Sequence, residues 1–276
     1  MAKLEKRLRA IDKEIDRFRI RIKDSEDLKS VEGVFDTFTL KTLYHLANKG
    51  YIDALGGVIS TGKEANIYHA FGGVISTGKE ANIYHAFGCE QEREREIAIK
   101  VYRISTSNFR AMQSYLIGDP RFKNVRHEKR SIVFAWTKKE LRNLKKAHAA
   151  GVRVPEPFVE RNNVLLMEFI GEDEIPAPQL REVPLTPDQA RKAFETTVEY
   201  VRILYHANLV HADLSEFNIL MHGNEVVFID MGQSVTLDHP NAMEFLMRDL
   251  HNVTRFFRRK GVRIEENAVV DTVLGE

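Results

Sequence analysis

The sequence predicts an α+β protein with two lobes, a small sheet lobe near the N-terminus and a helical lobe after it. Segments rich in Val, Ile and Tyr, which favour strands, lie mainly between Gly56 and Ile170. The chain has 276 residues, of which 43% are hydrophobic, so it can bury a large core. Strands that gather early and helices that gather late favour two lobes over an alternating α/β arrangement.

The first part of the chain is expected to begin with helices and to continue as a sheet. Residues 1–50 are interpreted as a helical extension, because apolar side chains recur at helical spacing from Lys3 to Lys23. Residues 51–170 form the expected sheet lobe. Glycines break short strands over Gly56–Ala86, and the alternating pattern of Glu96–Ile104 predicts a longer strand.

The second part, residues 171–276, is the expected helical lobe. Thr186 suits a helix N-cap, and Pro187 suits the first helical position that follows. The elements expected after Ile104 are, in order, a basic loop over Ser105–Arg130, a helix over Ser131–Gly151, two strands joined at Asn162-Asn163, a helix from Pro187 to about Asn208, two strands between His211 and Gly232, and helices from Pro240 onward.

Composition narrows the class of protein. The net charge is +1, and no apolar run approaches the roughly 18 residues of a membrane span. Cys89 is the only cysteine, which excludes a disulfide within the chain, and Met1–Arg21 lacks the apolar stretch of a signal peptide. We therefore expect a cytoplasmic protein. The basic stretches Arg103–Lys146 and Arg255–Arg263 are compatible with ordinary solvated surface or with an anionic partner such as RNA.

A block of sixteen residues, Gly56–Phe71, is repeated without change as Gly72–Phe87. Each copy contains G-x-x-x-x-G-K, which resembles the phosphate-binding loop of P-loop proteins. In both copies the next residue is glutamate, where that loop requires Ser or Thr, and the segment that follows is strand-like. A strand hairpin whose glycine turn covers nucleotide phosphates is the better interpretation, although a simple tight turn has the same pattern.

The second copy is the expected nucleotide loop. It runs through a connection of ordinary length into the strand that follows, whereas the first copy would need the second to loop out. The residues expected to contact the nucleotide in this loop are Ser76, Thr77, Gly78, Lys79, Glu80 and Ala81.

Lys100 lies in the strand segment "IAIKVY", a pattern typical of the lysine strand of protein kinases. A lysine on a buried strand needs an anionic partner, because an unpaired ammonium group is costly to bury. Nucleotide phosphates and a helix carboxylate are suitable partners, and Glu140 on the next helix is the best-placed carboxylate. We expect Lys100 to contact the nucleotide and to pair with Glu140.

The stretch "LVHADLSEFNIL" contains His211, Asp213 and Asn218 in the pattern H-x-D-x-x-x-x-N of a kinase catalytic loop. Asp230, in Asp-Met-Gly, then ends a hydrophobic strand where kinases have Asp-Phe-Gly. Asp213 is expected to orient or deprotonate the attacking hydroxyl, and Asn218 and Asp230 to hold the metal. The ordered set of motifs is far more specific than any one of its members.

Four segments, "STGKEA", "IAIKVYR", "HADLSEFNIL" and "IDMGQSV", together resemble the RIO family of atypical serine/threonine protein kinases, most closely its first subtype in an archaeal-like form. The resemblance covers about Val34 to the C-terminus. It implies a bilobal protein-kinase-like fold, ATP with Mg²⁺ or Mn²⁺, and autophosphorylation on serine. It also implies a role in maturation of the small ribosomal subunit, with its protein and rRNA as partners.

The resemblance has two implications for individual residues. Asp230 could accept phosphate as an aspartyl-phosphate during ATP hydrolysis. The segment that follows the strand "VLL" corresponds to a kinase hinge, so the adenine is expected to contact the backbone of Met167, Glu168, Phe169 and Ile170.

Two departures from ordinary kinases leave alternatives open. The stretch after Gly232 contains no Ala-Pro-Glu motif and is short for a peptide platform, and Ser215 occupies the usual place of a catalytic-loop lysine. This favours an ATP-hydrolysing switch that phosphorylates itself or one bound partner. The alternatives are an assembly factor that uses ATP as a conformational ligand and, less favoured, an RNA-binding protein with relict motifs.

The basic stretch Arg103–Arg130 is expected to be a mobile loop, because it shows few apolar anchors to offset the entropy of ordering. A mobile segment with hydroxyl groups beside the nucleotide suits self-phosphorylation. We expect the modified residue among Ser105, Ser107 and Ser114.

Overall fold

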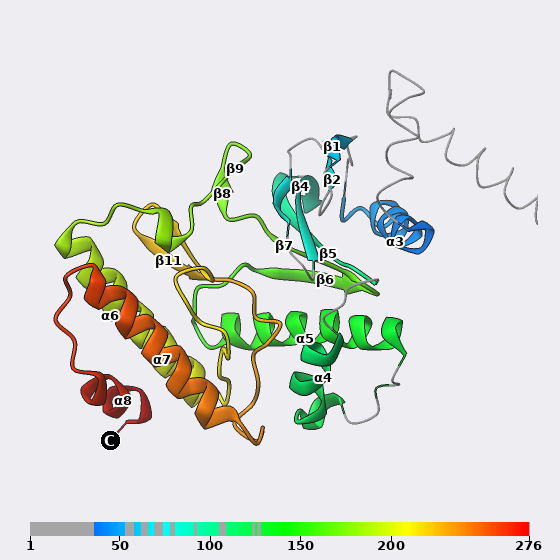
Figure 1. Ribbon diagram of the computed structural model, residues 1–276. Helices are drawn as coiled ribbons and strands as arrows, with labels where there is room; N and C mark the ends of the chain where they lie inside the picture. The colour runs from blue at the N-terminus through cyan, green and yellow to red at the C-terminus, as the bar shows by residue number, and fades with distance from the viewer. Residues whose placement is uncertain are drawn as a thin grey trace, which may run out of the picture.

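The computed structural model describes residues 36–52, 58–61, 66–68, 74–77, 81–90, 93–104, 109–122, 125 and 128–275. The helix expected from Lys3 to Lys23 lies outside these ranges. The described residues form a sheet lobe and a helical lobe, which confirms the α+β class (Figure 1). None of the helices among them combines the length and the apolar character that crossing a bilayer requires.

The sheet lobe is built on one antiparallel sheet with the strand order β3-β4-β5-β7-β6. Its central strand β5 pairs with β4 on one side and with β7 on the other, so it is covered at both edges. The strands are β3 (Val74–Thr77), β4 (Ala81–Glu90), β5 (Arg93–Tyr102), β6 (Pro157–Arg161) and β7 (Val164–Glu168).

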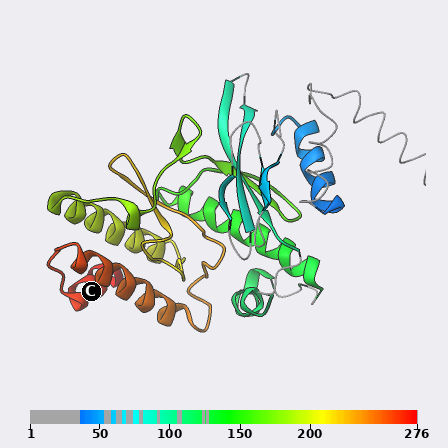
Figure 2. The same ribbon diagram turned by 45° about the horizontal axis from the view of Figure 1, so that its top comes forward.

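Helices α3 (Thr37–Asn48) and α5 (Lys129–Ala149) cover opposite faces of this sheet, as Figures 1 and 2 show. Alternate side chains of β5 face opposite sides, because a strand repeats every two residues. Ile97, Ile99 and Val101 pack in one core cluster with Leu43 and Leu46 of α3. The side chains between them, Ala98 among them, lie on the other face, and Ala98 packs in the cluster that contains Leu141 and Leu144 of α5.

The segment Ser105–Arg130 differs from the loop that the sequence predicts. Within it, α4 (Phe109–Ile117) and a short 3-10 helix, η1 (Pro120–Phe122), are formed. Met112 and Leu116 lie four residues apart on one face of α4 and are buried against α5 with Trp136. The expectation of few apolar anchors is therefore wrong for the described part, because these side chains supply enough burial to fix a helix.

The helical lobe has the expected order of elements. Thr186 caps α6 (Pro187–His206) by accepting a hydrogen bond from the Gln189 amide at 3.3 Å, and Pro187 is its first residue. The other elements of this lobe are β8 (Gly171–Glu172), β9 (Ile175–Pro176), η2 (Leu180–Glu182), β10 (Ile219–His222), β11 (Glu225–Phe228), α7 (Ala242–Arg259) and α8 (Glu266–Leu274). The strands β10 and β11 form a separate antiparallel pair, and β11 contacts α6.

The two repeated blocks form hairpins with the same internal register but in different places. In the first block, β1 (Val58–Thr61) and β2 (Asn66–Tyr68) form a sheet of their own. In the second block, β3 and β4 pair with the corresponding residues opposite each other and with a register shift at the corresponding place. Only the second hairpin is joined to β5, so the second copy is the one in the main sheet.

Candidate active site

Lys100 lies on the face of β5 that is turned toward α5. Its register partners are Ile83 on β4 and Leu165 on β7, so it projects from the middle of the sheet. The residue is 5% exposed. A lysine in this position can keep its charge only if anionic groups surround its ammonium group.

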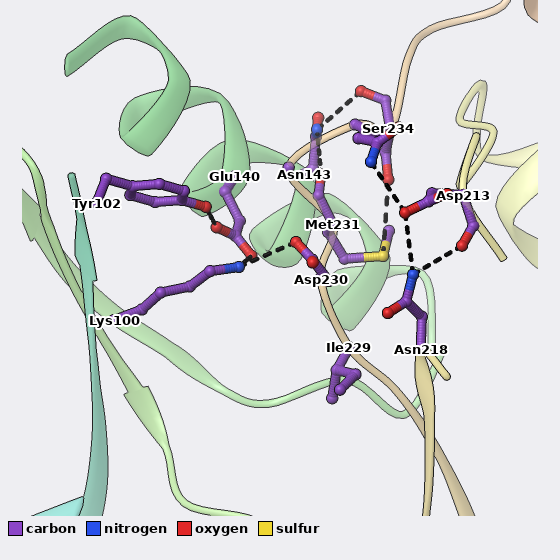
Figure 3. Close-up of polar contacts among 12 residues, drawn as sticks. Lys100, Tyr102, Glu140, Asn143, Asp213, Asn218, Ile229, Asp230, Met231 and Ser234 are labelled. Atoms are coloured by element: carbon purple, nitrogen blue, oxygen red, sulfur yellow. Dashed lines mark hydrogen bonds and ion pairs between the residues drawn. The ribbon is translucent and has the colours of Figure 1, made fainter. Parts of the chain in front are cut away.

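Two carboxylates supply that charge. Lys100 Nζ donates to Glu140 Oε1 at 2.8 Å and to Asp230 Oδ1 at 2.9 Å (Figure 3). Desolvation by itself would lower the pKa of Lys100, but Asp230 and Glu140 outweigh it and raise that pKa above its ordinary value. The pairing of Lys100 with Glu140 was predicted, and its direct pairing with Asp230 was not.

Tyr102 is a further partner of Glu140. It lies two residues after Lys100 on the same face of β5, and its hydroxyl group donates to Glu140 Oε2. Both carboxylate oxygens of Glu140 therefore accept hydrogen bonds from one strand. This arrangement fixes α5 against β5 next to the candidate site, as the left part of Figure 3 shows.

Asp230 is half-exposed, with 46% of its side chain accessible. Desolvation opposes ionisation of its carboxyl group, but the charge of Lys100 and the hydrogen bond from it dominate and lower the pKa of Asp230. The carboxylate is thus held ionised at neutral pH. Its backbone adopts φ 62°, a left-handed conformation that is costly for a residue other than glycine and that often marks functional sites.

The catalytic-loop residues form a second cluster. The Asn218 side-chain amide donates to Asp213 O at 2.8 Å and to Asp213 Oδ2 at 3.1 Å, and Gln233 Nε2 donates to the same Oδ2 at 2.9 Å. Gln233 follows Asp-Met-Gly, so this contact joins the two motifs directly. The hydrogen bonds orient the Asp213 carboxylate, which is the position at which the sequence predicts the hydroxyl-activating group.

The His211 side chain is buried and neutral, and it connects two segments of the site. Its ring is 2% exposed, and Nε2 donates to Ile229 O at 3.0 Å. Burial lowers the pKa of His211 to about 4, so the ring is neutral at pH 7. The hydrogen bond links the start of the catalytic loop to the residue before Asp230.

Asp249 of α7 binds the backbone of the catalytic loop through hydrogen bonds. The Ala212 amide donates to its Oδ2 at 2.7 Å, and the Leu214 amide donates to its Oδ1 at 2.9 Å. These two amides flank Asp213. Arg248 adds a hydrogen bond from its guanidinium group to Ala212 O at 2.5 Å. Ala212 has φ 66°, so α7 holds the loop in a conformation that the backbone alone disfavours.

Asn218 and Asp230 fit a metal that arrives with a nucleotide. The Ile229 amide donates to Asn218 O at 3.0 Å, which keeps the two residues on neighbouring strand ends. They offer amide and carboxylate oxygens, the ligands that Mg²⁺ prefers, and Mg²⁺ commonly takes one or two protein ligands plus phosphates. Within the described ranges no group of three or more His, Cys, Asp or Glu side chains could hold a metal alone.

Two side chains of the expected hinge, those of Glu168 and Phe169, contact other residues of the protein. Arg153 donates to both carboxylate oxygens of Glu168, at 2.6 and 2.7 Å, and also to Glu225 at 3.0 Å. Phe169 is buried and lies edge-on to the ring of His85, with ring centroids 4.5 Å apart. Two backbone groups of the expected hinge are also engaged, because the Glu168 amide donates to Glu156 O at 2.8 Å and the Ala177 amide donates to Ile170 O at 2.9 Å.

Other expected nucleotide contacts are only partly within the described residues. Ser76 and Thr77 end β3, and Ala81 begins β4 and is buried. Gly78, Lys79 and Glu80 lie outside the described residues. Among the residues that sequence reasoning missed, Tyr102 could have been found from its place two residues after Lys100. Gln233 lies in the segment "IDMGQSV" but was given no role of its own, and Asp249 belongs to no motif that marks it.

Comparisons with known proteins agree with this geometry. Residues 82–269 match the family described as the RIO domain. The RIO-type serine/threonine-protein kinase Rio1 of Haloferax volcanii is 44% identical over 265 residues, which are 96% of this chain and 84% of that protein. The serine/threonine-protein kinase RIO1 of Homo sapiens is 41% identical, over 91% of this chain and 41% of that protein.

The fold has solved counterparts. A Rio2 kinase from Chaetomium thermophilum, crystallised as an ADP/Mg²⁺-phosphoaspartate complex, superposes with a TM-score of 0.52 and 20% identity. The match covers 86% of this chain and 76% of that one. At this identity the likeness establishes the protein-kinase-like fold. The domain match and the identity to the archaeal and human proteins show that the chain belongs to the RIO family of serine/threonine-protein kinases.

Proposed function

We propose that this chain is a serine/threonine kinase and ATPase of the first RIO subtype, which transfers the γ-phosphoryl group of ATP bound with Mg²⁺ or Mn²⁺. The observation that carries the proposal is the double ion pair of Lys100 with Glu140 and Asp230. Kinases require such a lysine to be paired with the helix carboxylate while the metal-binding Asp is also in place. The names of the archaeal and human relatives support the same activity.

The residues have distinct roles in this proposal. The hydroxyl oxygen of the acceptor attacks the γ-phosphorus, its proton passes to the Asp213 carboxylate, and the bond to ADP breaks. Lys100 contacts the phosphates, and Glu140 fixes that lysine. Asn218 and Asp230 hold the metal, which neutralises charge on the phosphates. The backbone of Met167–Ile170 contacts the adenine, and Ser76 to Ala81 cover the phosphates.

Asp230 is also proposed as a phosphate acceptor. One of its carboxylate oxygens attacks the γ-phosphorus, ADP leaves, and water later hydrolyses the aspartyl-phosphate. The half-exposed side chain and its lowered pKa support this role, because they provide an accessible, ionised oxygen. The Rio2 kinase of Chaetomium thermophilum contains a phosphoaspartate. A hydroxylamine-labile phosphoprotein that is lost in Asp230→Asn is the expected sign.

A second candidate function is an ATP-dependent assembly factor whose ATP acts as a conformational ligand. It is favoured by the short connection from Gln233 to Asn241, after which α7 begins at once. That connection leaves little chain for a peptide-binding segment, and the sequence contains no Ala-Pro-Glu motif. We propose the pre-ribosomal small subunit, in the cytoplasm, as the partner in either case, on the basis of the family resemblance.

The test uses γ-labelled ATP with wild-type protein, Asp213→Asn and Asp230→Asn. Wild-type protein is expected to label itself on serine and to release ADP. Asp213→Asn is expected to lower both rates by about 10² to 10⁴, the usual contribution of a positioned base. Asp230→Asn is expected to abolish turnover while nucleotide affinity stays within about tenfold. ATP binding without label transfer or ADP release in wild-type protein would favour the assembly-factor function.

A further inference from the structure

Helix α5 presents an unusual polar face to the core. Trp136, Lys139, Glu140 and Asn143 stand at helical spacing of i, i+3, i+4 and i+7, so they share one side of the helix. All four are buried, and Lys139 and Asn143 have no measurable exposure. Charged and amide side chains are rarely buried to this extent unless they are paired. Glu140 pairs with Lys100, which leaves the task of Lys139 and Asn143 to be explained.

Lys139 and Asn143 both donate hydrogen bonds to the backbone that follows Asp230, and we call these two residues the clamp. Lys139 Nζ donates to Gly232 O at 2.8 Å and to Ser234 O at 2.5 Å. Asn143 Nδ2 donates to Met231 O at 2.8 Å and to Ser234 O at 2.9 Å. The three carbonyls lie in one short loop, Met231–Ser234, which we call the metal loop. Figure 3 shows Asn143 between α5 and this loop.

Gly232 of the metal loop packs closely against Trp136 of α5. A Cβ atom added at Gly232 would lie 3.0 Å from Trp136 Nε1, which is closer than real side chains normally approach. The Trp136 ring also lies 5.3 Å from Lys139 Nζ. A side chain at Gly232 would therefore require Trp136 or the loop to shift by a few tenths of an ångström.

Lys139 is held by carbonyl groups rather than by a counter-charge. Among the described residues, no carboxylate lies within ion-pair distance of its ammonium group, and the nearby Asp119 is bound to Arg121 at 2.6 Å. Burial lowers the pKa of Lys139 to about 7, with Asp119 opposing that shift and Arg121 adding to it. A lysine in this state costs stability, so it is a poor choice if its only task is to fill space.

These contacts close a ring of interactions around the site. Lys100 binds Glu140 on α5, and Lys139 and Asn143 bind α5 to the metal loop. That loop begins directly after Asp230, which returns to Lys100. Rotation of α5 away from the sheet would therefore displace the metal loop as well, because the helix and the loop are bound as one unit.

We propose that Lys139 and Asn143 are positioning residues that fix Asp230 in the orientation that binds the nucleotide-bound metal. The inference rests on the proposed function, because it assigns these residues to the same site. They touch neither nucleotide nor metal, and they act only through the backbone of the metal loop. The helix and loop are held in their working arrangement by side chains of the fold itself, without a phosphorylated activation segment.

The experiment separates metal-linked affinity from nucleotide affinity as such. ADP binding is measured by titration calorimetry with excess Mg²⁺ and again with EDTA, for wild-type protein, Lys139→Met and Asn143→Leu. Both substitutions keep the approximate size of the side chain and remove its donors. Lys138→Met is the matched control, because Lys138 is the exposed neighbour on the same helix. Thermal unfolding identifies variants that fold, and Asn143→Leu serves if Lys139→Met does not fold.

The clamp variants are expected to lose the gain that Mg²⁺ brings. ADP affinity in Mg²⁺ is expected to fall by up to about tenfold, because loss of a group that orients a metal ligand weakens metal binding but cannot cost more than the tenfold limit expected for Asp230→Asn itself. Affinity in EDTA is expected to change by less than about threefold, a small step on the affinity scale. Lys138→Met is expected to match wild-type protein in both conditions.

Three results overturn the proposal in distinguishable ways. Equal losses with Mg²⁺ and with EDTA would mean that the residues are only structural. A full Mg²⁺ gain in both variants would mean that the clamp does not position Asp230, while the proposed function stands. If wild-type protein itself shows no Mg²⁺ gain, the proposed function is wrong and the clamp proposal falls with it.

Discussion

Lys100 Nζ lies 2.9 Å from Asp230 Oδ1, so the strand lysine is paired directly with the carboxylate that immediately precedes the metal loop. The pair connects the sheet lobe to the loop of the helical lobe across 130 residues of sequence. It also holds the pKa of Asp230 below its ordinary value. Nucleotide phosphates that approach Lys100 meet an ammonium group that is already engaged.

The first prediction concerns the pH below which Mg²⁺ no longer increases the affinity for ADP. In wild-type protein Asp230 stays ionised as the pH falls from 8 to 5, because Lys100 lowers its pKa. In Lys100→Met the largest remaining influence on that carboxyl group is desolvation, which raises the pKa, while the smaller opposing effects of His211 and the Gly232 amide stay in place. The Mg²⁺-dependent gain in ADP affinity, measured by calorimetry across this range, is expected to stay constant in wild-type protein. In Lys100→Met it is expected to begin to fall at a higher pH, and identical profiles would contradict the prediction.

The second prediction separates the two repeated blocks. Lys79→Ala is expected to weaken ATP binding or turnover more than Lys63→Ala, because only the second hairpin is joined to the strand of Lys100. The two proteins differ only in which copy is changed, so each is the control of the other. ATP affinity and ADP release decide the order. Equal effects would mean that either copy can occupy the site, and the reverse order would assign it to the first copy.

The third prediction concerns stability and pH. Burial raises the pKa of Asp249 from 3.8 to about 7, although the Leu214 and Ala212 amides oppose that shift. The folded state therefore holds a proton that the unfolded state loses above pH 4, and this contribution to stability disappears as the pH rises to about 7. Relative to Asp249→Asn, the free energy of unfolding of wild-type protein is expected to fall by at most roughly 1.4 kcal/mol per pH unit across this window.

Denaturant unfolding of the two proteins at pH 5, 6, 7 and 8 measures that difference. Above pH 7 the difference is expected to be constant, because Asp249 is then ionised in both states. A difference that is constant from pH 5 to 8 would show that the Asp249 carboxyl group has an ordinary pKa.

The fourth prediction concerns self-phosphorylation. The modified residue is expected among Ser105, Ser107 and Ser114. Ser114 lies on the exposed side of α4, beside the Glu140 helix, and Ser105 and Ser107 lie outside the described residues. Incubation with labelled ATP, digestion and mass spectrometry locate the phosphate. Phosphate found only outside Arg103–Arg130 would contradict the prediction, and the Asp213→Asn protein is the control for transfer by a contaminating kinase.

Parts of the fold that depend on local pattern could be predicted from the sequence. The cap at Thr186 and the turn at Asn162-Asn163 act within a few residues, and both appear where expected. The helix α4 was not predicted, because it is only nine residues long and lies within a basic stretch, although the spacing of Met112 and Leu116 by four is the helical signal.

The sequence allowed prediction of those contacts in the candidate site that join two side chains. Lys100 and Glu140 could be paired from strand and helix periodicity, and both belong to a recognisable order of motifs. Asp249, Lys139 and Asn143 could not be found in this way, because they bind backbone amides or carbonyls. A backbone group leaves no mark in the sequence, so such partners emerge only when the chain is folded.

The repeated hairpin has a consequence for how this lobe can change over time. Identical residues adopt the same pairing in β1–β2 and in β3–β4, although only one of the two hairpins borders the main sheet. The block thus forms the same hairpin in two surroundings, once within the five-stranded sheet and once as a sheet of its own. One copy can serve while the other accumulates mutations, which makes this margin of the lobe a place where new loops could arise.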